Sequence, residues 1–134
     1  AGVLHPAAGA YDVVFDSRAP AGAGAFTFRF WVDDVTPPTA RLLKPSVPRR
    51  TPIGIRVADA GSGVDRSSIL VTVGGVTRST TLSGGVIRVG TSGLARGRHK
   101  LRLQVSDYQE PRNKENEARI LPNTPVQRAK VTIR

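Results

Sequence analysis

Acidic side chains are gathered in a few short stretches of this 134-residue sequence. Asp33 and Asp34 lie directly before Thr36-Pro37-Pro38, a run typical of a linker because proline cannot donate to a strand ladder. The acidic residues of 36–134 all fall in two loop-like stretches, and they are Asp59, Asp65, Asp107, Glu110, Glu115 and Glu117. The strand pattern described below brings both loops and the linker to one end of the fold. Eight of the ten carboxylates are therefore expected at one pole.

Carboxylate oxygens that converge from a linker and two loops suit Ca²⁺, which takes six to eight oxygens at roughly 2.3–2.6 Å. The candidate metal ligands are Asp33, Asp34, Asp59, Asp65 and Asp107. Two ordinary roles for these carboxylates stay open. Asp59 and Asp107 could instead cap their own turns by accepting backbone N–H groups. The basic residues of the same loops, Arg66, Arg112, Lys114 and Arg119, could pair with them at the surface.

Basic residues dominate the charge of the sequence, with twenty Lys and Arg against ten Asp and Glu. The excess lies in residues 36–134, where eighteen basic and six acidic residues leave a net charge of +12. Such a field favours polyanions such as nucleic acid, an anionic cell-wall polymer or an acidic glycan. The ordinary interpretation, that these charges solvate the surface and keep sheets from pairing, stays open beside it.

Strand parity selects the basic residues that would share one face. Basic residues alternate with His99, Leu101 and Leu103 in one strand and with Ala129 and Val131 in the last. If the apolar residues point inward, the basic ones form an outward stripe, because successive strand residues face opposite sides. The candidate polyanion-binding residues are Arg98, Lys100, Arg102, Arg128 and Lys130.

Residues for catalysis are scarce. The only histidines are His5, in an irregular stretch, and His99, which is expected to point into the core of a strand. The sequence has no Cys, which excludes disulfides, thiolate metal sites and cysteine nucleophiles. It also has no nucleophile elbow and no phosphate-binding loop. We therefore expect no enzyme activity within this chain.

The elements that position these residues are short strands with period-two alternation, separated by Gly-, Pro- and Asp-rich turns. Almost no helix is expected. The expected strands are 39–44, 52–58, 68–73, 77–82, 86–89, 98–106 and 126–133. Seven such strands predict an all-β fold, a seven-stranded antiparallel immunoglobulin-like sandwich over residues 36–134.

Three motifs carry a family resemblance. They are Thr36-Pro37-Pro38, then Asp59-x-Gly61-Ser62-Gly63-Val64-Asp65, then Leu94-x-x-Gly97-x-His99-x-Leu101-x-Leu103-x-Val105-Ser106-Asp107. Together they resemble the bacterial immunoglobulin-like and cadherin-like repeats, which occur in tandem on secreted and cell-surface proteins. The resemblance implies an extracellular or cell-surface location, neighbouring modules of the same kind, and calcium at the joint between modules. The final loop is longer than is usual in such repeats.

Residues 1–35 differ in composition from the rest and hold six of the seven aromatic residues, Tyr11, Phe15, Phe26, Phe28, Phe30 and Trp31. Tyr11, Val13 and Phe15 alternate, as do Phe26, Phe28 and Phe30, on either side of a turn-rich stretch. This pattern predicts an aromatic-rich β-hairpin, the last two strands of a preceding module, followed by a linker. Its apolar face would meet a neighbouring module or, in this chain alone, a second copy in a homodimer.

These observations predict a non-catalytic structural, spacer or adhesion module of a larger surface or secreted protein. The alternative is an accessory module that binds a polyanion or glycan through the basic sheet face. No run of 18 apolar residues is present, so no membrane span is expected. The sequence contains no Met, and we expect it to be a piece of a longer chain.

Overall fold

The computed structural model describes residues 7–15, 21, 24–32, 34–109 and 123–134. Within these ranges the chain is all-β and its strands form two sheets. The strands are β1 (Thr39–Leu42), β2 (Ser46–Val47), β3 (Ile53–Ala58), β4 (Val64–Val73), β5 (Val76–Thr77), β6 (Thr80–Ser83), β7 (Val86–Val89), β8 (Gly97–Asp107) and β9 (Val126–Ile133). Among the described residues, no helix is long and apolar enough to cross a membrane.

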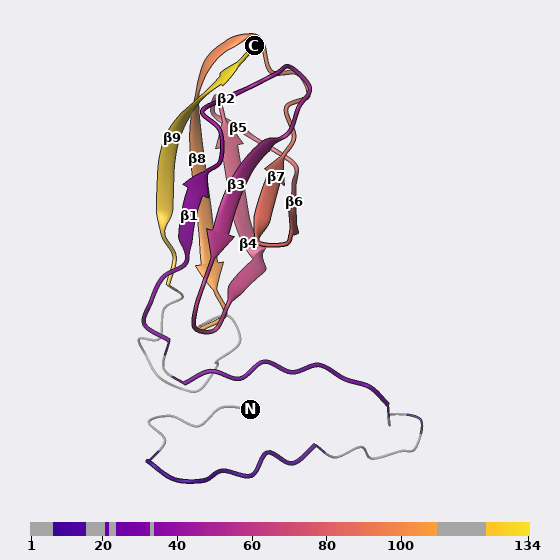
Figure 1. The fold of residues 1–134 in the computed structure, drawn as a ribbon, viewed down its shortest axis with the longest axis vertical. Helices are drawn as coiled ribbons and strands as arrows, with labels where there is room; N and C mark the ends of the chain where they lie inside the picture. Colours follow the sequence, from indigo (N-terminus) through magenta and orange to yellow (C-terminus); the bar gives the residue numbers. More distant parts are fainter. Residues whose placement is uncertain (1–6, 16–20, 22–23, 33, 110–122) are drawn as a thin grey trace.

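The two sheets lie face to face and run along the long axis of the molecule (Figure 1). One has the strand order β1-β3-β7-β6 and the other β2-β9-β8-β4-β5. Every pair is antiparallel except β2 with β9, which is parallel. The long central strands β4 and β8 form the backbone of the second sheet and run from one pole of the sandwich to the other.

Alternating apolar residues from both sheets fill the space between them, which is where stacked sheets form their core. In β3, for example, Ile53, Ile55 and Val57 are buried while Arg56 is exposed. The buried hydrophobic residues are Val47, Ile53, Ile55, Val57, Val71, Val73, Ile87, Val89, Leu94, Leu101, Leu103, Val105, Val131 and Ile133. This core contains Val, Ile and Leu alone, consistent with the preference of branched side chains for strands.

The expected all-β class with two sheets is confirmed, but the strand count differs in the described part of the chain. The segment expected as one strand at 77–82 is two, because β5 pairs with β4 in one sheet and β6 pairs with β7 in the other. The short β2, flanked by Pro45 and Pro48, was not expected and pairs with the end of β9. β4 begins earlier than expected and carries a register shift between Asp65 and Leu70, typical of a β-bulge.

The described residues before β1 contain no strand, so the hairpin expected over residues 1–35 is not confirmed. Two extended stretches, 7–15 and 24–32, lie beyond one pole of the sandwich (Figure 1). Their aromatic side chains contact one another without backbone pairing. The ring of Phe15 lies 4.5 Å from that of Phe26 and 5.2 Å from that of Phe28, measured between centroids.

Candidate functional site

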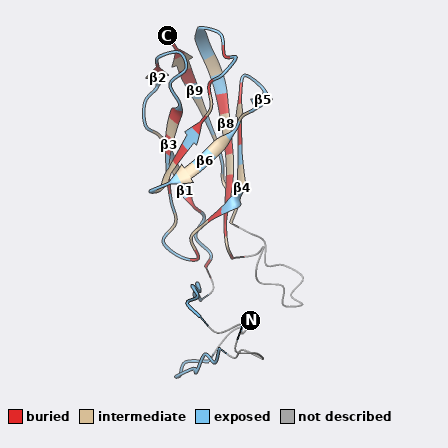
Figure 2. Ribbon diagram, turned by 90° about the vertical axis from the view of Figure 1, so that its right-hand side faces the viewer, coloured by how far each residue is buried: buried red, intermediate tan, exposed pale blue. Residues whose placement is uncertain are grey.

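The site lies at the pole where three segments meet: residues 34–38, the β3–β4 loop, and the chain that follows β8. Buried residues reach this pole and continue past the last strand residues into the loops (Figure 2). Three aspartates are among them: Asp34 is 7 % exposed, Asp65 is 3 % exposed and Asp107 is 0 % exposed. Because a buried carboxylate needs hydrogen bonds, an opposite charge or a metal ion, the partners of these aspartates indicate what the pole does.

Asp34 forms hydrogen bonds within residues 34–38, with the β3–β4 loop and with the chain that follows β8. Its Oδ2 accepts a hydrogen bond from the Ser62 amide at 2.6 Å, and its Oδ1 accepts one from the Thr36 amide at 3.1 Å. Its own amide donates to Oε1 of Gln109 at 3.2 Å, and its carbonyl oxygen accepts from Nδ2 of Asn123 at 2.6 Å. A single residue of the linker is therefore held by the β3–β4 loop and by both sides of the loop between β8 and β9.

Gly61 makes this arrangement possible. A Cβ built at Gly61 would fall on the carboxylate of Asp34, closer than side-chain atoms approach one another. The absence of a side chain lets the two backbones come together, which is a common role of glycine. The Gly61-Ser62-Gly63 turn therefore holds the linker aspartate, through the Ser62 amide and the space left at Gly61.

Asp107 is the last residue of β8, and its carboxylate lies close to that of Asp34. Its Oδ1 accepts from the amides of Gln109 at 3.1 Å and Asn123 at 3.3 Å, and its Oδ2 accepts from Nδ2 of Asn123 at 2.6 Å. Burial raises the pKa of Asp107 above its ordinary value, and the nearby charge of Asp34 adds to the increase. For Asp34 itself, burial acts to raise the pKa, but hydrogen bonds from Ser62 and Thr36 bring the pKa below its ordinary value.

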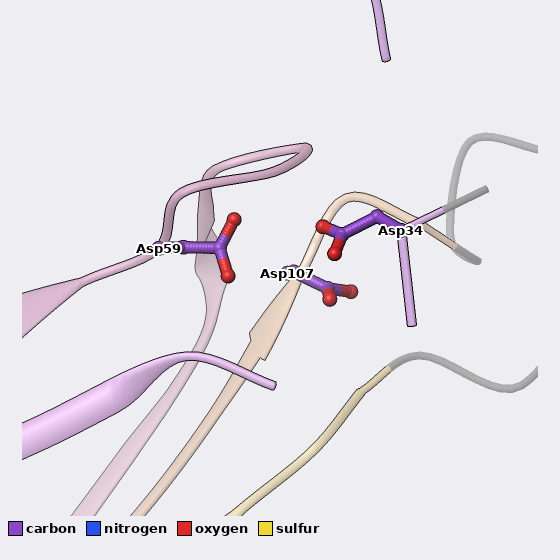
Figure 3. A group of neighbouring side chains, drawn as sticks. All are labelled: Asp34, Asp59 and Asp107. Atoms are coloured by element: carbon purple, nitrogen blue, oxygen red, sulfur yellow. The ribbon is translucent and has the colours of Figure 1, made fainter. Parts of the chain in front are cut away.

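Asp59 completes the group. Its Oδ2 accepts from the amides of Gly61 at 3.1 Å and Gly63 at 2.6 Å, while its Oδ1 is buried and has no hydrogen-bond partner. One ligand oxygen from each of Asp34, Asp59 and Asp107 lies within 4.8 Å of the others. Figure 3 shows the carboxylates of Asp59 and Asp34 directed toward each other, with the carboxylate of Asp107 next to that of Asp34 in this view.

This donor set fits a hard divalent cation. Oxygens that share one Ca²⁺ at about 2.4 Å lie at most about 4.8 Å apart, so the three carboxylates can reach a common ion. The buried, unpartnered Oδ1 of Asp59 is the observation that favours a cation, because a buried carboxylate oxygen without a partner is costly. Asp34, Asp59 and Asp107 would hold it.

The structure places the other candidate metal ligands apart from this group or does not describe them. The Oδ1 of Asp65 accepts from the amide of Ser67 at 2.9 Å and from its hydroxyl at 2.6 Å, so this carboxylate is occupied within β4, where the register shift begins. Asp33 lies outside the described residues, as do Glu110, Glu115, Glu117, Arg112, Lys114 and Arg119. The sequence left open that Asp59 and Asp107 cap their own turns. Both do accept backbone amides of their own turns, and their carboxylates also lie close together.

The side chains of Arg29 and Trp31 also form hydrogen bonds with residues of the pole, and no sequence pattern predicted either contact. The Nη1 of Arg29 donates to the carbonyl oxygen of Ser62 at 2.5 Å, and its guanidinium lies 4.0 Å from the ring centroid of Tyr108. The Nε1 of Trp31 donates to Oε1 of Gln109 at 2.6 Å. A shallow hollow of about 440 Å³ lies beside these contacts and is lined by Thr27, Phe28, Arg29, Trp31 and Tyr108.

The five candidate polyanion-binding residues lie on the outer face of the second sheet, as strand parity predicted. Arg98, Lys100 and Arg102 follow one another along β8, while Arg128 and Lys130 stand on β9. The register places Lys100 directly opposite Lys130 and Arg102 directly opposite Arg128. His99 lies on the other side of β8, half-buried, with Nε2 at 2.9 Å from the carbonyl oxygen of Ala95.

Comparison with protein-family models, with curated proteins and with solved structures finds no match to this chain.

Proposed function

We propose that this chain is a non-catalytic immunoglobulin-like module of a multi-domain secreted or cell-surface protein, acting as a spacer or adhesion unit. Its specific task is to hold the segment that precedes it in a fixed orientation. The observation that carries this proposal is the set of hydrogen bonds to Asp34, which ties the linker to both loops of the pole.

The order of the strands supports the immunoglobulin-like assignment. In immunoglobulin-like sandwiches, strands A, B, E and D form one sheet and strands C, F and G form the other. The sheet β1-β3-β7-β6 corresponds to A-B-E-D, and the run β9-β8-β4 corresponds to G-F-C. The short strands β2 and β5 extend the second sheet at its edges.

A spacer needs a stiff joint, because a flexible linker leaves neighbouring modules free to reorient. Here the bonds of Arg29, Trp31 and Asp34 fall within six residues, so the chain is fixed at three successive points before β1 begins. The hydrogen bonds of Asp34 and Trp31 lie at least partly out of water, where each is stronger than at the open surface.

Calcium would reinforce this joint. A bound Ca²⁺ would neutralise the mutual repulsion of Asp34, Asp59 and Asp107 and cross-link the linker to both loops. The protein supplies carboxylates that its backbone amides already orient, so the ligands are in place before an ion arrives.

Neighbouring modules are the proposed partners of the exposed aromatic residues. Phe15, Phe26 and Phe28 form one cluster in which each side chain remains more than half exposed. Exposed apolar clusters of this kind mark surfaces that bind other proteins. In a tandem protein the rest of the preceding module would cover them, and in this chain alone a second copy would.

Spin-label distances test the proposed joint. Because the chain has no Cys, Ala25→Cys with Ser83→Cys adds one label to the preceding segment and one to the sandwich, both at exposed positions. We expect a narrow distribution of label–label distances that broadens when Asp34→Ala is added. A distribution that is already broad with Asp34 in place would show that the pole does not orient the segment and would refute the spacer role.

A further inference from the structure

We propose that the outer face of β8 and β9 is a binding site for a linear anionic polysaccharide bearing sulfate or phosphate groups. The site is defined by Lys100, Arg102, Arg128 and Lys130, with Arg98 extending it along β8. It lies on the sheet face, distinct from the carboxylate pole, and does not depend on the proposed spacer function.

The first observation is that like charges face each other across neighbouring strands. Lys100 pairs with Lys130 and Arg102 with Arg128, so two successive outward-facing rows of the ladder each carry two positive charges. Directly opposed like charges destabilise a sheet. A face that keeps two such rows concentrates positive charge at the expense of stability, which is expected of a surface selected to bind anions.

The second observation is the absence of compensating acid. In the described part of the chain, the carboxylates of the sandwich lie at the other end of β8, with Asp107 as its last residue. Among the described residues, the one side-chain hydrogen bond of the basic cluster runs from Nη2 of Arg102 to Oε1 of Gln104, at 3.0 Å. This contact orients the guanidinium along the strand without neutralising it.

Protection of a sheet edge does not account for the cluster. β2 covers β9 only at Thr132 and Ile133, so charges at Arg128 and Lys130 could serve to block an open edge. β8, in contrast, is hydrogen-bonded to β4 on one side and to β9 on the other. Lys100 and Arg102 therefore stand on an interior strand where no edge needs protection.

The third observation is the shape of the surface. A shallow hollow of about 660 Å³ lies over these strands, lined by Thr72, Gly75, Lys100, Leu101, Arg102, Arg128, Ala129 and Lys130. Outward residues on one strand repeat about every 6.6–6.8 Å, so the basic groups form a regular row along the strand. An extended polymer with repeating anionic groups matches such a row, whereas a compact anion would use only part of it.

The residue types on this face favour a polymer without nucleobases. Within the described ranges, the aromatic residues lie in the N-terminal segment and at Tyr108, and none lies on this face. Proteins that bind single-stranded nucleic acid rely on aromatic side chains on which bases stack. The hydroxyls of Thr72 and Thr77, paired beside Arg102, add hydrogen-bond donors and acceptors suited to sugar hydroxyls.

The other sheet provides a matched control. Arg41 pairs directly with Arg56 on the outer face of the first sheet, so this face offers one opposed arginine pair without a second opposed pair of charges beside it. Its neighbour Arg88 faces Gly54 on one side and Thr81 on the other. Arg41→Gln with Arg56→Gln removes two positive charges, the same number as Arg102→Gln with Arg128→Gln.

The test is a titration of a fluorescent heparin octasaccharide, and separately of a short phosphorylated dextran of matched length, into the intact chain and both double variants. We expect Arg102→Gln/Arg128→Gln to weaken binding of at least one of the two polymers by about tenfold or more at ~50 mM salt and to make the salt dependence shallower. Arg41→Gln/Arg56→Gln should change the affinity less than about threefold. The polymer that binds more tightly identifies sulfate or phosphate as the preferred group.

Three results would overturn the proposal. One is a lack of binding of either polymer by the unaltered chain at ~50 mM salt. Another is an equal loss of affinity in both double variants, which would assign binding to net charge alone. The third is tighter binding of oligothymidine of matched charge, which would point to nucleic acid. Melting curves verify that both variants fold, and removal of opposed like charges should not lower the melting temperature of either.

Discussion

Ser62 donates its backbone amide to Oδ2 of Asp34 at 2.6 Å, across 28 positions of sequence. This bond joins the linker to the turn between β3 and β4, and both residues are buried. Because hydrogen bonds to a charged group contribute more than neutral ones, Asp34→Ala should lower the free energy of unfolding by about 1.5–3 kcal/mol. Urea unfolding measures the change. Asp12→Ala, at an exposed carboxylate of the same N-terminal region, is the control and should stay within about 0.5 kcal/mol.

Gly61→Ala should disturb the same contact from the other side. The added methyl group would meet the Asp34 carboxylate, and we expect a cost of about 1–3 kcal/mol in stability. In an Asp34→Ala background the carboxylate is gone, so the methyl group should cost much less. A double-mutant cycle measures this coupling. Additive effects of the two substitutions would contradict the close packing of Gly61 against Asp34.

The carboxylates of Asp34 and Asp107 should titrate on opposite sides of the ordinary aspartate pKa. The pKa of Asp34 is below 3.8 in the folded chain, so its contribution to stability is present above 3.8 and is lost as pH falls through the folded value. The pKa of Asp107 is above 3.8, so its burial penalty is present at neutral pH and is relieved as pH falls toward 3.8. Without calcium, stability should therefore rise slightly on mild acidification and fall below pH 3.8.

Carboxyl-carbon NMR titration assigns these steps to residues. Asp34→Asn removes the charge that helps to raise the pKa of Asp107, so the Asp107 transition should move to lower pH in that variant. An unchanged Asp107 transition would show that the two carboxylates do not interact.

Millimolar Ca²⁺ should raise the melting temperature of the chain by a few degrees relative to chelator, because an ion that binds only the folded state stabilises it by mass action. Asp59→Asn should abolish the increase, since it removes charge from the one carboxylate oxygen that is buried without a partner in the described part of the chain. Asp65→Asn is the matched control, because Asp65 is also buried but its carboxylate accepts a hydrogen bond from Ser67 and is not part of the group. Identical melting curves with and without Ca²⁺ would remove calcium from the proposed joint.

The aromatic cluster before the sandwich should cause self-association of this chain. Phe15, Phe26 and Phe28 are 52 %, 60 % and 65 % exposed, and each fully buried aromatic side chain contributes about 1.5–3 kcal/mol. Sedimentation velocity should show a dimer that increases with concentration and is lost in Phe15→Ser/Phe28→Ser. A chain that remains monomeric at all concentrations would contradict this expectation.

The sequence predicts the sandwich well and the joint only in part. Period-two alternation placed β3, β7, β8 and β9 within one or two residues, because inward side chains such as Ile53 and Ile55 must be apolar. The switch of the chain between sheets at Arg78 and Ser79 left no such trace, since both halves of that segment look like strand.

At the pole, topology predicted that Asp34, Asp59 and Asp107 would share one end, and they do. It did not predict the roles of Gln109 and Asn123, whose side-chain amides connect the linker to the loop. Such contacts depend on side-chain geometry and leave no periodic pattern. The sequence placed Asp65 in the same loop as Asp59, but in the structure Asp65 lies in β4 and its carboxylate accepts hydrogen bonds from Ser67.

Backbone and indole nitrogen relaxation tests the central claim, that the pole holds the preceding segment rigidly, most directly. The amides of Asp34 and Ser62 and the indole of Trp31 report on the two sides of the joint. We predict order parameters of about 0.85 for Asp34 and Trp31, equal to those of β8, because rigid backbone has values near this level. Values below about 0.6 for Asp34 and Trp31, with a rigid sandwich beside them, would contradict the joint and the spacer function built on it.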